Sequence, residues 1–105
     1  MLLWLDDLRP MPVGFDLWAK TAEEAVKMIK ENDITFISFD HDLGNDKALT
    51  GYDVACFIEN RAVRGIKPPD WAIQSSNPVG ANKIRMAMES AHSYYQRIHE
   101  ELNND

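Results

Sequence analysis

The sequence predicts an α/β fold, a three-layer sandwich built around a short, mainly parallel sheet of about four strands. Short apolar runs that suit buried strands alternate along the chain with segments whose apolar residues follow helical spacing. Turn and cap residues separate these segments, so that strands and helices follow each other in a regular order. The 105 residues, 45% of them hydrophobic, suffice for one core and predict a single domain over residues 1–105.

The strands are predicted from their composition. Residues 2–5 form a short apolar run, residues 34–39 are rich in β-branched and aromatic side chains, and residues 71–73 form a third buried strand. Two prolines and a glycine make residues 9–14 a loop. In residues 15–20 the apolar residues Phe15, Leu17 and Ala19 occupy alternate positions, which predicts an edge strand.

The helices are predicted from their first residues. A Thr-Ala-Glu-Glu capping box opens a helix over residues 21–32, and Thr-Gly-Tyr-Asp opens another over residues 50–62. Asn77 caps the last helix, and Pro78 suits its first position because the missing N–H is not needed there. The last helix carries an apolar stripe, expected to pack on the sheet or to pair with a second copy in a homodimer: Ile84, Met88, Ala91, Tyr95, Ile98 and Leu102.

The order of these elements gathers the polar residues at one edge. Right-handed crossovers restrict the topology to a flavodoxin-like arrangement, in which ligands bind outside the carboxyl ends of the strands. The residues that follow the three buried strands are polar: Asp6 and Asp7, then Asp40, His41 and Asp42, then Gln74, Ser75 and Ser76. The predicted fold therefore brings together groups that lie far apart in the sequence.

The acidic residues of this edge predict a cation site. Three carboxylates within a few ångström repel one another, and a hard divalent cation such as Mg²⁺ or Mn²⁺ relieves the repulsion. We expect Asp7 and Asp40 as direct ligands, with Asp6 or Asp42 acting through water or a backbone carbonyl. The alternative is that these residues are strand-end and turn acids that hold no metal.

Other residues of this edge suit a phosphate. Ser75, Ser76 and Asn77 precede a helix N-terminus, whose free amides attract anions, although the same residues also serve as helix caps. Arg9 can reach a phosphate from the first loop, or lie on the surface beside a proline. His41 lies between two acids, which favours its protonated form and a role as proton donor; the alternative is a turn residue that faces solvent.

Charge and composition exclude several classes of protein. The net charge of −6 disfavours broad binding along a nucleic-acid backbone, which needs a basic surface. No apolar run approaches the roughly 20 residues that span a bilayer. Residues 1–5 are too few for a secretory signal, and the single cysteine, Cys56, permits no intrachain disulfide. We therefore expect a cytoplasmic protein without a membrane partner.

The acids and hydroxyls resemble the site of response-regulator receiver domains. Asp6 and Asp7 are similar to the acidic pair of these domains, Asp40 to the phospho-accepting aspartate, and Ser75 or Ser76 to the Ser/Thr. Receiver domains carry a further strand and helix with an essential lysine. We expect this chain to lack that last strand–helix unit, and the sequence offers no lysine at the matching place.

A closer resemblance covers nearly the whole chain. Residues 3–12, 37–44, 50–53 and 75–80 are similar to motifs of the cyclic-phosphate-processing receiver-like family. The resemblance implies a truncated receiver fold, found in bacteria and their phages, that processes cyclic phosphate ends as in RNA repair. The family typically has a histidine before its Ser-x-Asn-Pro stretch, and here that position is Gln74, which can hydrogen-bond a phosphate but cannot transfer a proton.

Two functions follow from this reading, and a third is weaker. The first is a metal-dependent phosphoesterase acting on cyclic phosphate ends of RNA or nucleotides, with Asp40, His41 and Asp42 as catalytic residues. The second is a non-catalytic receiver-like module that binds a phosphorylated ligand or protein partner. The third is a haloacid-dehalogenase-like phosphatase, because residues 39–42 echo its Asp-x-Asp motif; that motif belongs at the first strand, and the other motifs are absent.

Overall fold

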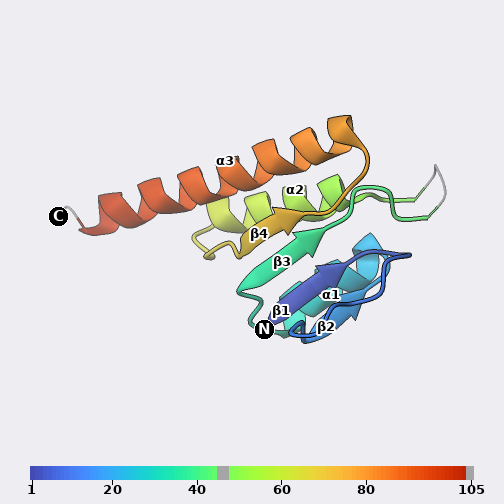
Figure 1. The fold of residues 1–105 in the computed structure, drawn as a ribbon. Coiled ribbons are helices and arrows are strands. Elements are labelled where there is room, and N and C mark those ends of the chain that lie inside the picture. The colour runs from blue at the N-terminus through green and yellow to red at the C-terminus, as the bar shows by residue number, and fades with distance from the viewer. Residues whose placement is uncertain (45–47, 104–105) are drawn as a thin grey trace.

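The computed structural model describes residues 1–44 and 48–103 and contains one sheet with three helices (Figure 1). Its elements follow in the order β1 (Leu2–Leu5), β2 (Leu17–Ala19), α1 (Ala22–Glu31), β3 (Phe36–Phe39), α2 (Gly51–Val63), β4 (Asp70–Ile73) and α3 (Pro78–Asn103). The four strands are parallel and lie in the order β2-β1-β3-β4. The predicted α/β fold and the order of its elements are confirmed. The expected burial of the strand at residues 71–73 is wrong, because β4 lies at an edge of the sheet and its residues are exposed or half-buried.

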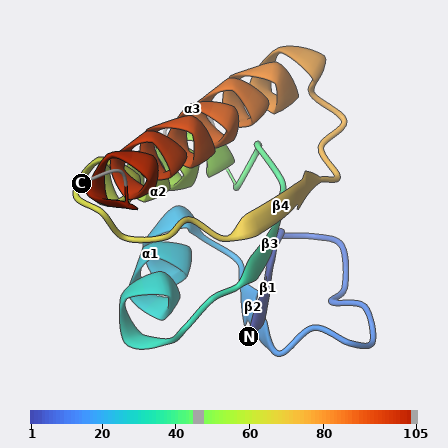
Figure 2. The same ribbon diagram turned by 90° about the vertical axis from the view of Figure 1, so that its left-hand side faces the viewer.

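The three helices lie on one face of the sheet, as Figure 2 shows with the sheet seen edge-on. The expected third layer exists, but a loop forms it instead of a helix: residues 6–16, which connect β1 to β2, lie over the opposite face. Pro10, Pro12 and Gly14 within this connection prevent it from forming a helix. Among residues 1–44 and 48–103, loop residues cover the face opposite the helices.

Aromatic side chains attach this loop to the sheet. The ring of Phe15, in the loop, lies 5.2 Å from that of Trp4 in an edge-on arrangement and 6.2 Å from that of Phe36. Such pairs stabilise a contact by about 0.5–1.5 kcal/mol beyond the area they bury. The loop that carries Asp7 and Arg9 is thus anchored at its far end.

The core fills the space between the sheet and the helices. In β1 and β3 alternate residues point to the helices, as the period of two requires, and these residues are fully buried: Leu3, Leu5, Ile37 and Phe39. Helix α2 contributes Val54 and Ile58, and α3 contributes Ile84 and Met88. This single cluster fixes which face of each strand remains for the functional groups.

The predicted caps are present. The Thr21 hydroxyl accepts a hydrogen bond from the Glu24 amide at 3.1 Å, and the Thr50 amide donates to the Asp53 carboxylate at 2.7 Å. The side-chain oxygen of Asn77 accepts a hydrogen bond from the amide of Gly80 at 3.0 Å, in the first turn of α3. Each cap satisfies an amide that the start of a helix leaves without a partner.

Helix α3 is twice as long as α2, with 26 residues against 13 (Figure 1). Its first half packs in the core, where Ile84 and Met88 are fully buried, whereas Leu102 near its end is 73% exposed. Packing of the stripe is thus confirmed for its first half, and pairing with a second copy stays a prediction. In the described part of the chain, no helix is both long and apolar enough to cross a membrane.

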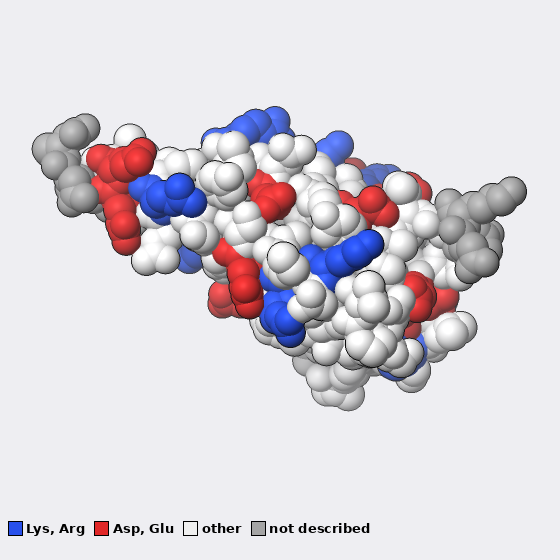
Figure 3. All heavy atoms as spheres, turned by 90° about the horizontal axis from the view of Figure 1, so that it is seen from above, with Lys and Arg blue, Asp and Glu red and all other residues white. Residues whose placement is uncertain are grey.

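The face drawn in Figure 3 carries both signs of charge. Lysine and arginine side chains are interspersed there with aspartate and glutamate, and neither sign forms a continuous area.

Candidate functional site

The register of the sheet aligns three polar residues at its carboxyl edge. Leu5 pairs with Phe39, which pairs with Ile73, so Asp6, Asp40 and Gln74 follow in one row. Hydrogen bonds continue the ladder into this row, from the Asp40 amide to the Leu5 carbonyl at 2.8 Å and from the Gln74 amide to the Phe39 carbonyl at 2.9 Å. Because the preceding residues point to the helices, the row points to the opposite face.

Asp6 is fully buried, and both oxygens of its carboxylate accept hydrogen bonds. Its Oδ1 accepts hydrogen bonds from the amides of Leu8 at 2.9 Å and Arg9 at 2.8 Å. Its Oδ2 accepts from Nη1 of Arg9 at 3.0 Å and from Nε2 of Gln74 at 3.5 Å. Burial raises the pKa of Asp6, but these hydrogen bonds together outweigh burial and lower the pKa below its ordinary value.

Asp40 occupies the centre of the row and is also buried. Burial raises its pKa, and the nearby charge of Asp6 raises it further, whereas the His41 amide and the charge of Arg9 lower it; the net shift is upward. Nη1 of Arg9 lies 3.8 Å from Oδ1 of Asp40. The negative charge of Asp40 is therefore incompletely compensated.

Asp7 completes the acidic cluster from the loop that follows β1. Its Oδ2 accepts a hydrogen bond from the amide of Gly44 at 3.0 Å, which connects it to the loop after β3. Carboxylate oxygens of Asp6, Asp7 and Asp40, one from each, lie within 4.8 Å of one another. An all-oxygen donor set of this kind fits a hard divalent cation, so the predicted metal ligands are brought together.

Gln74 points along the row toward the acids. Its Oε1 accepts a hydrogen bond from the Ser38 hydroxyl, and its Nε2 donates to the Leu5 carbonyl at 3.0 Å. Both ends of the amide are therefore engaged with the protein, which connects β4 to β3 and β1. The expected contact of Gln74 with a phosphate stays a prediction, and in this structure the side chain positions Asp6.

His41 lies on the other side of its strand end from the acids. Its Nδ1 lies 2.8 Å from Oδ1 of Asp42 and 3.4 Å from Nδ2 of Asn77. The same side-chain nitrogen of Asn77 donates a hydrogen bond to Oδ1 of Asp42 at 3.3 Å. Bonding to His41 and Asn77 lowers the pKa of Asp42. Within residues 1–44 and 48–103, no hydrogen bond joins the His41 ring to Asp6, Asp7 or Asp40.

The loop after β4 supplies the predicted hydroxyls. Asn77 caps α3, as expected, and the Ser75 hydroxyl accepts a hydrogen bond from the backbone N–H of Asn77 at 3.1 Å. Ser76 is exposed beside them. The structure therefore gives Ser75 and Asn77 a role in shaping the start of α3, and their expected contact with a phosphate stays a prediction.

Two glycines allow the helices to approach the loop after β3 closely. A Cβ on Gly51 would stand 3.0 Å from the carbonyl carbon of Asp40 and nearer still to its oxygen. A Cβ on Gly80 would stand 2.5 Å from Nδ1 of His41. Real Cβ contacts essentially never fall below 3.0 Å, so glycine at both positions is required for this placement of Asp40 and His41.

Sequence reasoning missed three residues that support the site. The indole N–H of Trp4 donates to the Arg9 carbonyl at 2.9 Å, and that of Trp18 donates to the Asp6 carbonyl at 2.7 Å. Ser38 is 5% exposed and bonds Gln74. A serine inside an apolar strand and tryptophans in short strands each need a hydrogen-bond partner, which is the signal that could have found them.

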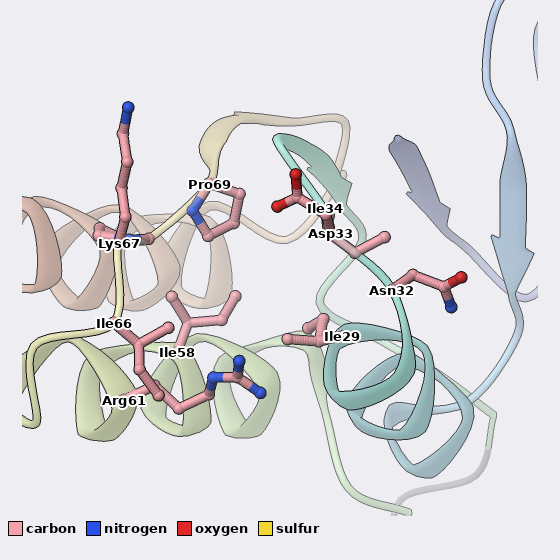
Figure 4. Close-up of a pocket in the computed structure, with 10 residues that line it drawn as sticks. Ile29, Asn32, Asp33, Ile34, Ile58, Arg61, Ile66, Lys67 and Pro69 are labelled. Atoms are coloured by element: carbon pink, nitrogen blue, oxygen red, sulfur yellow. The ribbon is translucent and has the colours of Figure 1, made fainter.

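A separate cavity lies at the opposite edge of the sheet (Figure 4). Residues near the amino ends of β3 and β4, among them Asp33 and Pro69, line it together with Arg61 of α2. Its volume of about 70 Å³ is far below the roughly 300 Å³ of small-molecule sites, and it contains none of the predicted site residues. It is not the candidate site.

A four-stranded parallel sheet with acids at the ends of β1 and β3 defines a receiver-like α/β domain. The family model for the cyclic-phosphate processing receiver domain matches residues 1–90, and the chain belongs to this family. The resemblance predicted from the motifs is thereby confirmed. The match ends within α3, so the last turns of that helix lie outside it. Neither the curated proteins nor the solved structures gave a match.

Proposed function

We propose that this protein is a metal-dependent phosphoesterase that acts on cyclic phosphate ends of RNA or nucleotides. The proposal rests on the acidic cluster of Asp6, Asp7 and Asp40, whose oxygens lie within 4.8 Å of one another at the carboxyl edge of the sheet. Membership of the cyclic-phosphate processing receiver family supports this choice of substrate.

The three carboxylates are suited to hold Mg²⁺ or Mn²⁺ in different ways. We assign the direct contacts to Asp7, which is partly exposed, and to Asp40, whose charge is incompletely compensated. Oδ1 of Asp6 already accepts two backbone hydrogen bonds, which favours contact through its Oδ2 or through water. When bound, the ion would neutralise phosphate charge and polarise a water molecule for attack on phosphorus.

Proton transfer falls to the pair of His41 and Asp42. Asp42 bonds Nδ1 of the imidazole, which fixes the ring and leaves Nε2 as the nitrogen that exchanges a proton with a ligand. Asn77 and Gly80 hold this pair against the first turn of α3. We assign phosphate contact to the hydroxyl of Ser76, because Ser76 is exposed and precedes the first amides of that helix.

A second function is a non-catalytic module that binds a phosphorylated ligand or protein partner. Two observations favour it: Gln74 replaces the family's histidine and has both ends of its amide engaged, and His41 makes no hydrogen bond to the acidic cluster within the described residues. Such a module would bind phosphate at the same edge without hydrolysing it.

Incubation with an RNA oligonucleotide that ends in a 2′,3′-cyclic phosphate separates the two functions. We would add Mg²⁺ or Mn²⁺ and compare the wild type with Asp40→Asn, an EDTA-treated sample, and Asp33→Asn, an exposed acid at the opposite edge of the sheet, as control. Ring opening by the wild type and Asp33→Asn alone supports the enzyme. Without turnover, a metal-dependent rise in melting temperature supports the binding module; without that rise, the metal site itself is wrong.

A further inference from the structure

We propose that Arg9 is a tethered counter-cation: its guanidinium fills the cation position between Asp6 and Asp40 when no metal is bound, and a divalent ion displaces it. The displaced guanidinium then becomes available to a phosphate at the same edge. This inference rests on the proposed metal site and adds to it a residue that sets the metal affinity of the protein.

The position of the guanidinium carries the inference. A single nitrogen, Nη1 of Arg9, lies 3.0 Å from Oδ2 of Asp6 and 3.8 Å from Oδ1 of Asp40. Mg²⁺ binds carboxylate oxygens at about 2.0–2.1 Å and draws them toward one point. The nitrogen contacts two of the three acids proposed to hold the ion, so the guanidinium and the ion would compete for the same carboxylates.

The backbone of Arg9 is fixed, and only its side chain is free to move. Its amide donates to Oδ1 of Asp6 at 2.8 Å, and its carbonyl accepts the indole N–H of Trp4 at 2.9 Å. The side chain is 45% exposed, so water already reaches it. Displacement therefore requires rotation of one side chain while the loop keeps its place.

The carboxylates tolerate the departure of the guanidinium. Without it, Asp6 still accepts hydrogen bonds from the amides of Leu8 and Arg9 and from Gln74, and the incoming ion replaces the lost positive charge. The net charge at the edge becomes more positive by two when a divalent ion enters and the arginine stays nearby. A planar guanidinium then suits a bidentate contact with phosphate oxygens.

Metal titration tests the competition directly. Isothermal titration with Mn²⁺ alone would compare the wild type with Arg9→Gln, which removes the charge, and with Arg9→Lys, which keeps a charge but not the planar fork. Arg85→Gln is the matched control, since Arg85 is 53% exposed and lies on α3 away from the row. We expect Arg9→Gln to bind Mn²⁺ about tenfold more tightly, because a charge-assisted hydrogen bond no longer has to be broken.

A second measurement follows the displaced side chain. In metal-loaded protein, inorganic phosphate should bind Arg9→Gln more weakly than the wild type, the reverse of the effect on Mn²⁺. In EDTA, Arg9→Gln should melt at a lower temperature than Arg85→Gln, because Asp6 and Asp40 lose their counter-charge. The melting temperature can be measured without metal and without activity. In EDTA, the melting temperature of Arg9→Lys should lie between those of Arg9→Gln and the wild type.

The outcomes separate the inference from the proposed function. Mn²⁺ binding by the wild type with equal or weaker binding by Arg9→Gln overturns the role of Arg9 and leaves the metal site intact. Binding by Arg9→Gln alone supports a guanidinium that blocks the site. Absence of binding by every variant overturns both the metal site and the inference.

Discussion

The first turn of α3 packs directly against the imidazole of His41 at Gly80, where a Cβ would stand 2.5 Å from Nδ1 and Cδ2 of the ring. His41 comes from the end of β3, and Gly80 lies 39 residues later in the chain. The same turn bonds Asn77, whose amide donates to Asp42. The orientation of His41 is thus set by a helix that begins after the neighbouring strand.

We predict that Gly80→Ala destabilises the protein. In an open helix the change would stabilise by about 1 kcal/mol, because alanine favours helix. Here the added methyl group overlaps with the His41 ring, and overpacking of this kind costs about 1–3 kcal/mol. Urea unfolding would measure the difference.

The double variant with His41→Ala is the control for this prediction. Without the imidazole, the methyl group of Gly80→Ala has space, and only its helix propensity remains. Gly80→Ala should therefore stabilise the His41→Ala protein. Destabilisation of the same size in both backgrounds would mean that something other than His41 limits this position.

Gly51→Ala should be more damaging than Gly80→Ala, and no second substitution of a side chain should rescue it. Its Cβ would meet the backbone carbonyl of Asp40, which cannot rotate away as an imidazole can. The amide of Gly51 also donates to the His41 carbonyl at 3.0 Å, so the helix start cannot retreat without losing this bond. We expect a loss of more than about 3 kcal/mol, or failure to fold, measured by circular dichroism. Wild-type stability of this variant would contradict the close packing of α2 on the strand end.

Asp40→Asn should raise the stability of the metal-free protein and abolish its stabilisation by Mg²⁺. Asp40 is buried beside the charge of Asp6, so a neutral amide of the same shape removes the repulsion between the two carboxylates. The side-chain oxygen of the asparagine can still accept a hydrogen bond from the backbone N–H of His41. Thermal unfolding in EDTA and then in Mg²⁺ would measure both effects. A Mg²⁺-dependent shift that survives in the variant would exclude Asp40 as a metal ligand.

The advantage of Asp40→Asn in EDTA should depend on pH. Burial and the charge of Asp6 raise the pKa of Asp40 above its unfolded value of about 3.9, so the folded state favours the protonated carboxyl. This contribution to stability is present below the unfolded pKa and is lost as the pH rises through the folded pKa. The difference between the variant and the wild type should therefore be small near pH 4, increase with pH and then level off. Urea unfolding over this range would measure it, and a pH-independent difference would contradict the raised pKa.

Much of the fold could be predicted because its signals are local. Apolar runs, capping residues and the Asn-Pro pair located the strands and helices found in the described part of the chain, and the rule for parallel sheets placed the acids of β1 and β3 at one edge. The helices on a single face were harder to foresee, since this depends on residues 6–16 forming a loop where a helix would have covered the second face. Which segments cover each face of the sheet depends on how the whole chain folds, and no local pattern specifies it.

The candidate site was predictable in its members but not in its contacts. Asp6, Asp7 and Asp40 were expected together, and their oxygens are close. The ion pair of Arg9 with Asp6, and the contact of Gln74 with the Leu5 carbonyl, depend on which face of the sheet each side chain points to. A shift of one residue in the register of a strand would move its side chains to the other face. No sequence pattern specifies such a contact, so these two residues were given a role toward phosphate that the structure leaves untested.

Gln74→His tests whether the family's histidine is the one residue that this chain lacks for efficient ring opening. If that histidine transfers a proton, its return should increase the rate of ring opening on the cyclic phosphate, by about 10²–10⁴-fold for a well-placed acid or base.

The substitution also breaks contacts, because an imidazole cannot bond the Ser38 hydroxyl, the Leu5 carbonyl and Asp6 together as the amide does. A folding cost of about 1–3 kcal/mol is therefore expected for one unpaired buried group, and Gln74→Leu serves as the control that carries this cost without an acid or base. A gain with histidine and none with leucine would assign proton transfer to this position. Equal rates for both variants would leave His41 as the proton donor or, with no turnover at all, favour the binding module.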